Sequence, residues 1–293
     1  MKDPAFVRRV SIELSKCGIR RLPLSLAKPA AFHYYKSMKR KGKGVPLTLL
    51  QMDTSKDGGG CVDRVLHTLG SIVRKKGGIV LLPEIWSGDF AWPEIEATAH
   101  KTPAILKELC RISRDHSSLI VGSLPERRGE HLLNTAFLVE DGRVLGRYVK
   151  QYLFSPMEED RYFSTRRSRK VFDTKYGKIG VAICFDLRFP ESFRTFHRSG
   201  GWLILVPAQW PKPRCAHWET LLVARAIENQ AFVAGCNRVG KTGRTSFCGG
   251  SMIVDPWGKV LARGKGRHGM VSAVVHPGRT DEVRKSIPMN GIG

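Results

Sequence analysis

The chain has 293 residues, 42% of them apolar, which is enough for one large folded domain and too apolar for a disordered chain. Its 49 Lys and Arg residues against 26 Asp and Glu give a net charge of +23, a surplus that attracts polyanions without specifying a fold. No apolar run approaches the roughly 20 residues that cross a bilayer, so we disfavour a membrane protein. The seven cysteines include no CxxC pair, so we also disfavour a disulfide scaffold and a cysteine-rich zinc site. We therefore expect a reducing compartment, the cytoplasm.

Residues 1–44 form a basic N-terminal extension ahead of the predicted domain. They contain 12 Lys and Arg residues but only Asp3 and Glu13 as acids, and they end in a basic run at 39–43. An Arg-rich, acid-poor composition is typical of targeting segments, but it also fits a mobile extension or a true start at Met38. We therefore predict a basic extension over 1–44 and a single folded domain over 45–293.

The first half of this domain alternates strands and helices. Strands are predicted at 47–52, 79–82 and 119–124, and amphipathic helices at 61–76 and 104–115. Two further strands, 132–140 and 144–149, flank Asp141-Gly142, which is a strong hairpin signal.

The second half repeats this pattern. Strands are predicted at 171–173, 179–183, 202–206, 231–236, 251–254, 259–262 and 270–275, with a helix over 217–229. Pro190 and Glu191 are well suited to open one more helix. Two similar halves of strands with helices between them predict layered α/β packing.

Cys184 lies where a buried strand meets a turn. The segment Gly180–Glu191 is apolar up to Cys184, and a residue at such a corner can present its side chain outward, as nucleophile elbows do. Free backbone N–H groups beyond the corner can stabilise a thiolate or an oxyanion. Taken alone, a buried structural cysteine remains the more ordinary interpretation, as for Cys110 and Cys236.

Two charged residues at other strand ends are candidate partners for this thiol. No motif marks any of the nine histidines as a base, and His217, which heads a helix, is interpreted as structural. Glu84 follows the strand that ends at Pro83, and a carboxylate can act as the base instead of histidine. Lys150 ends the strand 144–149, where its charge can stabilise an oxyanion. Taken alone, Glu84 and Lys150 are each also explained as an ordinary solvated residue.

The order of these segments resembles the carbon–nitrogen hydrolase (nitrilase) superfamily. The segments around Glu84, Lys150 and Cys184 occur in its order and approximate spacing. The resemblance covers residues 45–288 and continues through 205–211, 217–222, 224–230, 237–240 and 250–256. It is strongest to the omega-amidase branch, whose usual Cys-Tyr-Asp-Leu-Arg-Phe-Pro is similar to Cys-Phe-Asp-Leu-Arg-Phe-Pro at 184–190.

The resemblance implies a four-layer α-β-β-α sandwich that pairs into a homodimer, and it implies roles for particular residues. Cys184 is expected to be the nucleophile, Glu84 the general base and Lys150 the oxyanion partner. Two departures from the family pattern are Tyr152, where relatives usually have His, and Gln209, where many have Asn. Both leave substrate or pH preference open.

Four more residues are expected to bind substrate or to support the site. The family places a second glutamate near the lysine, for which Glu159 is chosen and the adjacent Glu158 stays open. The backbone N–H of Phe185 is expected to bind the oxyanion, and Trp210 to line the pocket, although core packing also explains Trp210. Arg188 is a candidate clamp for a substrate carboxylate, with a structural salt bridge as the alternative.

The resulting hypothesis is a hydrolase that cleaves the C–N bond of a small, carboxylate-bearing amide through a cysteine thioester and releases ammonia. Nitrile or N-carbamoyl amide hydrolysis by the same triad is the sibling alternative. A basic nucleic-acid-binding protein is the alternative from another class, although no sequence signature of specific nucleic-acid binding is present. Neither a phosphate-binding glycine loop nor a metal-ligand cluster is evident, so no cofactor or metal is expected.

Overall fold

The computed structural model describes residues 44–54, 60–88 and 92–289. The predicted extension over 1–44 therefore lies outside the described residues, apart from Gly44. None of the helices among the described residues combines the length and the apolar character needed to cross a membrane.

The first of two large sheets contains six strands in the order β14-β1-β2-β3-β4-β5. The strands are β1 (Val45–Gln51), β2 (Gly78–Leu81), β3 (Ser118–Arg128), β4 (His131–Glu140), β5 (Arg143–Val149) and β14 (Gly269–Val275). The central strands β1, β2 and β3 are parallel, and the outer ones pair antiparallel. The carboxyl ends of β1, β2 and β3 consequently lie at one edge of this sheet.

The second large sheet has the order β13-β12-β9-β8-β7-β6. Its strands are β6 (Val171–Thr174), β7 (Gly177–Val181), β8 (Leu203–Ala208), β9 (Phe232–Asn237), β12 (Met252–Val254) and β13 (Val260–Arg263). Its centre, β7-β8-β9, is again parallel. The two sheets thus share one plan, as the alternation of strands and helices predicts.

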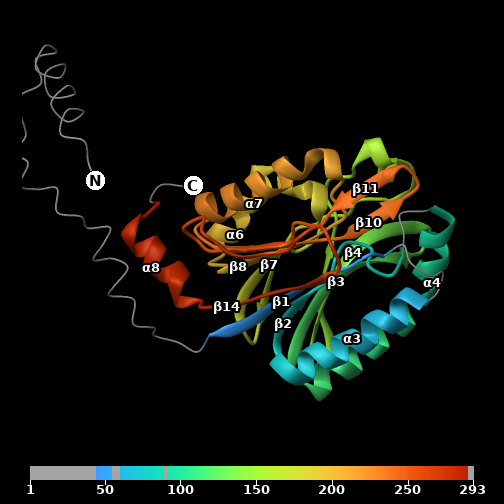
Figure 1. Cartoon of the computed structure of the whole chain (residues 1–293), viewed down its shortest axis with the longest axis horizontal. Coiled ribbons are helices and arrows are strands. Elements are labelled where there is room, and N and C mark those ends of the chain that lie inside the picture. Colours follow the sequence, from blue (N-terminus) through green and yellow to red (C-terminus); the bar gives the residue numbers. More distant parts are fainter. Residues whose placement is uncertain (1–43, 55–59, 89–91, 290–293) are drawn as a thin grey trace, which may run out of the picture. The chain divides into compact units, whose positions relative to one another are not determined.

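Helices cover the outer face of each sheet (Figure 1). On the first sheet lie α3 (Gly60–Lys76) and α4 (Trp92–Asp115), and on the second lie α6 (Pro190–Arg198) and α7 (Cys215–Asn229). A further helix, α8 (Gly278–Ser286), follows β14. The protein is therefore a four-layer α-β-β-α sandwich, as the resemblance implies.

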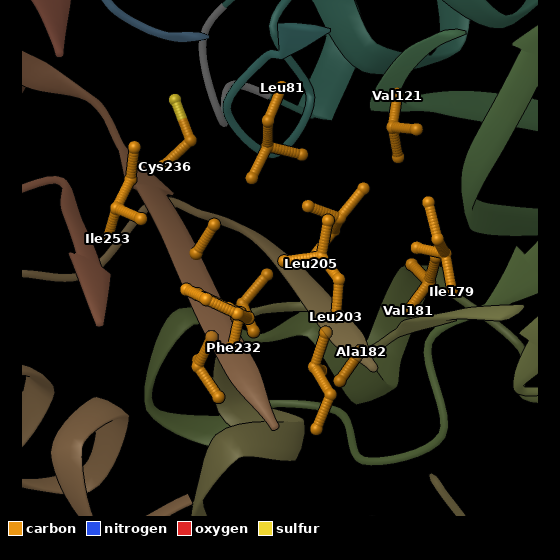
Figure 2. Packing of buried hydrophobic residues seen from close by; sticks show 14 of the residues in the cluster. Leu81, Val121, Ile179, Val181, Ala182, Leu203, Leu205, Phe232, Cys236 and Ile253 are labelled. Carbon is orange, nitrogen blue, oxygen red and sulfur yellow. The ribbon is translucent and has the colours of Figure 1, made fainter. Parts of the chain in front are cut away.

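The inner faces of the two sheets form one apolar core. Leu81 and Val121 of the first sheet lie opposite Val181, Leu203 and Leu205 of the second (Figure 2). All five side chains are fully buried. Burying an aliphatic side chain of this size contributes about 1.5–3 kcal/mol, so the contact between the sheets is a main source of stability.

The structure differs from the sequence expectations at several places, including α8, which was not predicted, and β3, which ends at Arg128 instead of 124. Helix α4 begins at Trp92, whereas the prediction starts at 104, and Pro103 lies inside the helix. The apolar residues upstream, Ile95 and Ala99, are buried and hold this part of the helix in place. The two-stranded sheet of β10 (Val239–Thr242) and β11 (Thr245–Cys248) was not predicted, because each strand is short and only partly apolar.

Candidate active site

Glu84 follows β2 and is held by donors from three separate segments. Its Oε1 accepts hydrogen bonds from Lys150 Nζ and from Asn134 Nδ2, each at 2.8 Å. Its Oε2 accepts one from the backbone N–H of Gln209 at 3.0 Å, and the Gln209 side-chain amide donates to the Glu84 carbonyl at 2.9 Å. The carboxylate is buried and its orientation is determined on both oxygens.

Lys150 directly follows β5 and lies between two carboxylates. Its Nζ donates to Glu84 Oε1 at 2.8 Å and to Glu159 Oε1 at 2.7 Å, and the three residues are at most 2% exposed. Burial alone would lower the pKa of this ammonium, but the charges of Glu159 and Glu84 outweigh burial and raise it above the usual value. Lys150 is therefore a fixed positive charge.

Glu159, and not Glu158, is the second glutamate at this lysine. It opens α5 (Glu159–Tyr162), and its Oε2 accepts a hydrogen bond from the backbone N–H of Phe154 at 3.0 Å. Burial raises its pKa to about 7, with Lys150 opposing that shift and Glu84 adding to it. The Glu158 side chain is instead exposed and pairs with Arg161.

Cys184 begins the short 3₁₀ helix η3 (Cys184–Arg188) just beyond β7. Its φ of +44° lies in the left-handed region, which costs a non-glycine residue about 1–3 kcal/mol and is concentrated at functional sites. The side chain is 7% exposed, and burial together with the charge of Glu84 raises the thiol pKa well above its usual value, against the opposing charge of Lys150. The resting thiol is therefore protonated and needs a base.

A pocket connects these groups to the outside. Glu84, Glu159 and Cys184 line it, together with the predicted Phe185, Arg188 and Trp210. The structure thus brings together every residue that the sequence analysis selected; Lys150 does not line the pocket but is buried and hydrogen-bonded to Glu84 and Glu159.

Two residues that depart from the family pattern have different surroundings. Gln209 also lines the pocket, and its Oε1 accepts a hydrogen bond from Arg238 at 3.0 Å while its main chain holds Glu84. Tyr152 is stacked on Phe189, with ring centroids 3.6 Å apart. Gln209 is therefore part of the support of Glu84, and Tyr152 packs beside the nucleophile turn.

The cysteines contain one pair that was not expected from the sequence. Cys215 and Cys248 form a disulfide between the start of α7 and the end of β11. Their separation of 33 residues carries no motif, and an isolated bridge between Pro211 and Phe247 brings the two segments together. Within residues 44–54, 60–88 and 92–289, no three His, Cys, Asp or Glu side chains are grouped so that they could hold a metal ion.

Comparison with known proteins identifies the family. The model of the carbon–nitrogen hydrolases matches residues 47–285. The chain belongs to the carbon–nitrogen hydrolase family. The protein is therefore an enzyme that acts on non-peptide C–N bonds and resembles the omega-amidases, as the sequence analysis expects.

Curated relatives and solved structures agree with this assignment. The 2-oxoglutaramate amidase of Bacillus subtilis (strain 168) is 35% identical over 218 residues, covering 73% of this chain and 84% of the relative. The human omega-amidase NIT2 is 30% identical over 256 residues, covering 83% and 92%. A mutant of the amidase from Nesterenkonia sp. AN1, with acrylamide added at its active-site cysteine, is 26% identical with a TM-score of 0.72, covering 83% and 98%.

Three residues of the site were not predicted from the sequence. Asn134 lies inside β4 and donates to Glu84, Asp186 lies buried two residues after Cys184, and Arg214 lines the pocket. The available signals were a polar residue within an apolar strand for Asn134 and, for Asp186, its place in the Cys-Phe-Asp-Leu-Arg-Phe-Pro segment at 184–190. Arg214 carries no signal in a chain with 49 basic residues.

Proposed function

We propose that the enzyme hydrolyses the terminal C–N bond of a small, carboxylate-bearing amide through a thioester on Cys184 and releases ammonia. The observation that carries the proposal is that the buried network of Glu84, Lys150 and Glu159 lines or backs the same pocket as Cys184. A base, a fixed cation and a thiol are the groups that acyl transfer from an amide requires.

In the first step the Cys184 sulfur attacks the amide carbon, and Glu84 accepts the thiol proton. This transfer is needed because the thiol pKa is raised. The negative charge that develops on the amide oxygen is stabilised by Lys150 and by the backbone N–H of Phe185. An ammonium has three N–H donors and two of those of Lys150 bind carboxylates, so one remains for the oxyanion.

In the second step the C–N bond breaks and Glu84 returns its proton to the leaving ammonia. The acyl group stays on Cys184 as a thioester. Glu84 then takes a proton from water, the resulting hydroxide attacks the thioester carbon, and Cys184 leaves as a thiol after it regains that proton. The products are a carboxylic acid and ammonia, and the enzyme returns to its starting protonation state.

Arg188 is proposed to bind the carboxylate at the far end of the substrate. It lines the pocket, lies 5.0 Å from the Trp210 ring centroid, and its Nη2 is 3.0 Å from His217 Nδ1. No structural acid pairs with it among the described residues, which favours the clamp over the salt-bridge alternative. The relatives named for omega-amide or 2-oxoglutaramate hydrolysis are consistent with a carboxylated substrate.

Acid-quenched mass spectrometry tests the nucleophile. After brief mixing with glutaramate, the acyl adduct should lie on the peptide that contains Cys184 and should be absent from Cys184→Ala. Cys110→Ala, which alters a free cysteine of α4, is the matched control and should keep the adduct. An adduct on any other cysteine would overturn the assignment.

A substrate panel separates the sibling activities. Ammonia release is measured from matched amides, nitriles and N-carbamoyl amino acids, and the carboxylated amide should have the highest kcat/KM. Preference for a nitrile or an N-carbamoyl compound would replace the amide proposal while keeping the triad. A homodimer and a cytoplasmic location are further proposals, which sedimentation and cell fractionation test.

A further inference from the structure

A second guanidinium lies at the mouth of the pocket, beside the one assigned to substrate binding. Arg214 ends the 3₁₀ helix η4 (Lys212–Arg214) and lines the same pocket as Arg188 and Cys184. Its Cζ lies 5.3 Å from the centroid of the Phe154 ring, as Arg188 lies over Trp210. Each cation is therefore supported by an aromatic ring of the pocket wall.

These two cations have no acidic counterpart in the described part of the chain. Neither Arg188 nor Arg214 forms an ion pair there, whereas the buried Arg225 and Arg238 pair with Glu228 and Asp53. Burial lowers the pKa of Arg188, and the positive charge of Arg214 lowers it further. Two like charges held at one mouth are unfavourable unless an anion binds between them.

The main chain at Arg214 is held firmly in place. Its carbonyl oxygen accepts a hydrogen bond from Trp210 Nε1 at 2.8 Å, and the next residue, Cys215, is bonded to Cys248. Arg188 is positioned independently, because it belongs to η3 and contacts His217. The two guanidinium groups thus come from separate, anchored segments that line the same pocket as the nucleophile.

We propose that Arg214 is a specificity-determining residue that binds the anionic end of the substrate together with Arg188. A carboxylate has two oxygens that accept several hydrogen bonds, and a planar guanidinium matches them in pairs. Because Arg188 is already engaged by His217 on one nitrogen, Arg214 supplies the donors that complete the site. The inference rests on the proposed amidase function and identifies what selects a carboxylated amide over a neutral one.

Kinetics on a matched pair of amides test the role of Arg214. Glutaramate carries the carboxylate, and pentanamide has the same carbon chain without it. In Arg214→Ala, the ratio of kcat/KM for glutaramate to that for pentanamide should fall about tenfold, mainly through KM. Arg214→Lys keeps the positive charge but lacks the planar guanidinium, so its ratio of kcat/KM values should lie between those of wild type and Arg214→Ala. Equal losses on both amides, or no loss on either, would refute the inference.

Lys212→Ala is the matched control, since it removes an exposed cation two residues away that does not line the pocket. It should leave the substrate ratio unchanged. A comparable fall in this variant would mean that general surface charge, rather than a built site, attracts the carboxylate.

Binding of the dianion glutarate judges the inference without turnover. Calorimetric titration should give a dissociation constant about tenfold higher for Arg214→Ala than for wild type and for Lys212→Ala. If the enzyme hydrolyses no amide, the proposed function fails, and glutarate binding still decides on Arg214. If glutaramate is hydrolysed but glutarate binds equally to wild type and Arg214→Ala, or to neither, the inference fails and the proposed function stands.

Discussion

The ammonium of Lys150 lies between the buried carboxylates of Glu84 and Glu159, so one positive charge is shared by two negative groups. In water such a pair would be weak, but burial strengthens the interaction and makes an unpaired charge costly. The raised pKa of Glu159 follows from this imbalance. The protonation of a single carboxyl group therefore controls how strongly Lys150 holds Glu84.

This shift predicts the pH dependence of turnover. Below about pH 7 Glu159 is neutral and the Lys150 ammonium binds mainly the Glu84 carboxylate, which is then less available to the thiol proton. Above about pH 7 the charged Glu159 shares the ammonium. We expect kcat/KM to rise with pH and level off above about 7. Glu159→Gln should remove this limb and lower activity at every pH, whereas Glu158→Gln should retain the wild-type profile.

The same shift affects folding stability with a defined sign. The folded state keeps the Glu159 proton between about 4.5 and 7, where the unfolded chain has lost it. The free energy of unfolding should therefore decrease as pH rises through this window.

An identical pH profile of kcat/KM in wild type and Glu159→Gln would contradict the assignment of the kinetic pH dependence to Glu159.

At the scale of elements, Asp186 joins the end of β5 to the turn of the nucleophile. Its Oδ2 accepts hydrogen bonds from the Tyr148 hydroxyl and the Ile183 N–H, both at 2.8 Å. Its Oδ1 accepts from the backbone N–H groups of Gln151 at 3.2 Å and Tyr152 at 2.9 Å. The segment after Lys150 and the segment before Cys184 are thus held by one buried carboxyl group.

Asp186→Asn should disturb both stability and catalysis. The amide replaces one accepting oxygen by a donor, so two of the four donors lose their partner, at a cost of about 1–3 kcal/mol. We expect kcat to fall at least tenfold with little change in KM, since Lys150 and Cys184 lose their alignment. Asp173→Asn, at an exposed ion pair with Arg169, is the control for both measurements. An unchanged kcat in Asp186→Asn would show that catalysis does not need the hydrogen bonds accepted by Asp186.

The disulfide between Cys215 and Cys248 joins α7 to β11. Closing a loop of 33 residues stabilises the folded state by roughly 2–4 kcal/mol, chiefly by restricting the unfolded chain. We expect Cys215→Ser to lower the free energy of unfolding by that amount, and with it the denaturation midpoint, and to remove the sensitivity of the midpoint to reductant. Cys110→Ser should leave that sensitivity intact. A wild-type midpoint that does not change on reduction would contradict a stabilising bond.

For the molecule as a whole, the contact between the two sheets should dominate stability. Leu205 is completely buried between them, whereas Leu261 of the edge strand β13 is 38% exposed. Leu205→Ala should cost about 2–5 kcal/mol of the free energy of unfolding, and Leu261→Ala less than about 1 kcal/mol. Urea denaturation of both variants measures the difference. Equal losses would mean that the sheet interface is not the principal core.

Much of the fold was predictable because apolar periodicity is a local property. The expected strands 144–149 and 231–236 differ from β5 and β9 by one residue at their ends. The start of α4 was not predictable, since packing of Ile95 and Ala99 outweighs the local signal of Pro103. For the site, Glu84, Lys150 and Cys184 were selected with help from the family resemblance. The sequence shows that each residue lies at the end of a strand, but it does not show which residues of other segments lie next to it in space.

The sequence by itself determined the order of strands and helices, the corners at which Glu84, Lys150 and Cys184 stand, and the kind of chemistry that these side chains can perform. The tertiary structure alone decided which buried polar groups meet them. Asn134 and Gln209 lie 50 and 125 residues from Glu84 in the chain and bind the same carboxylate. Hydrogen bonds and charges act through space, whereas sequence patterns report only neighbours along the chain.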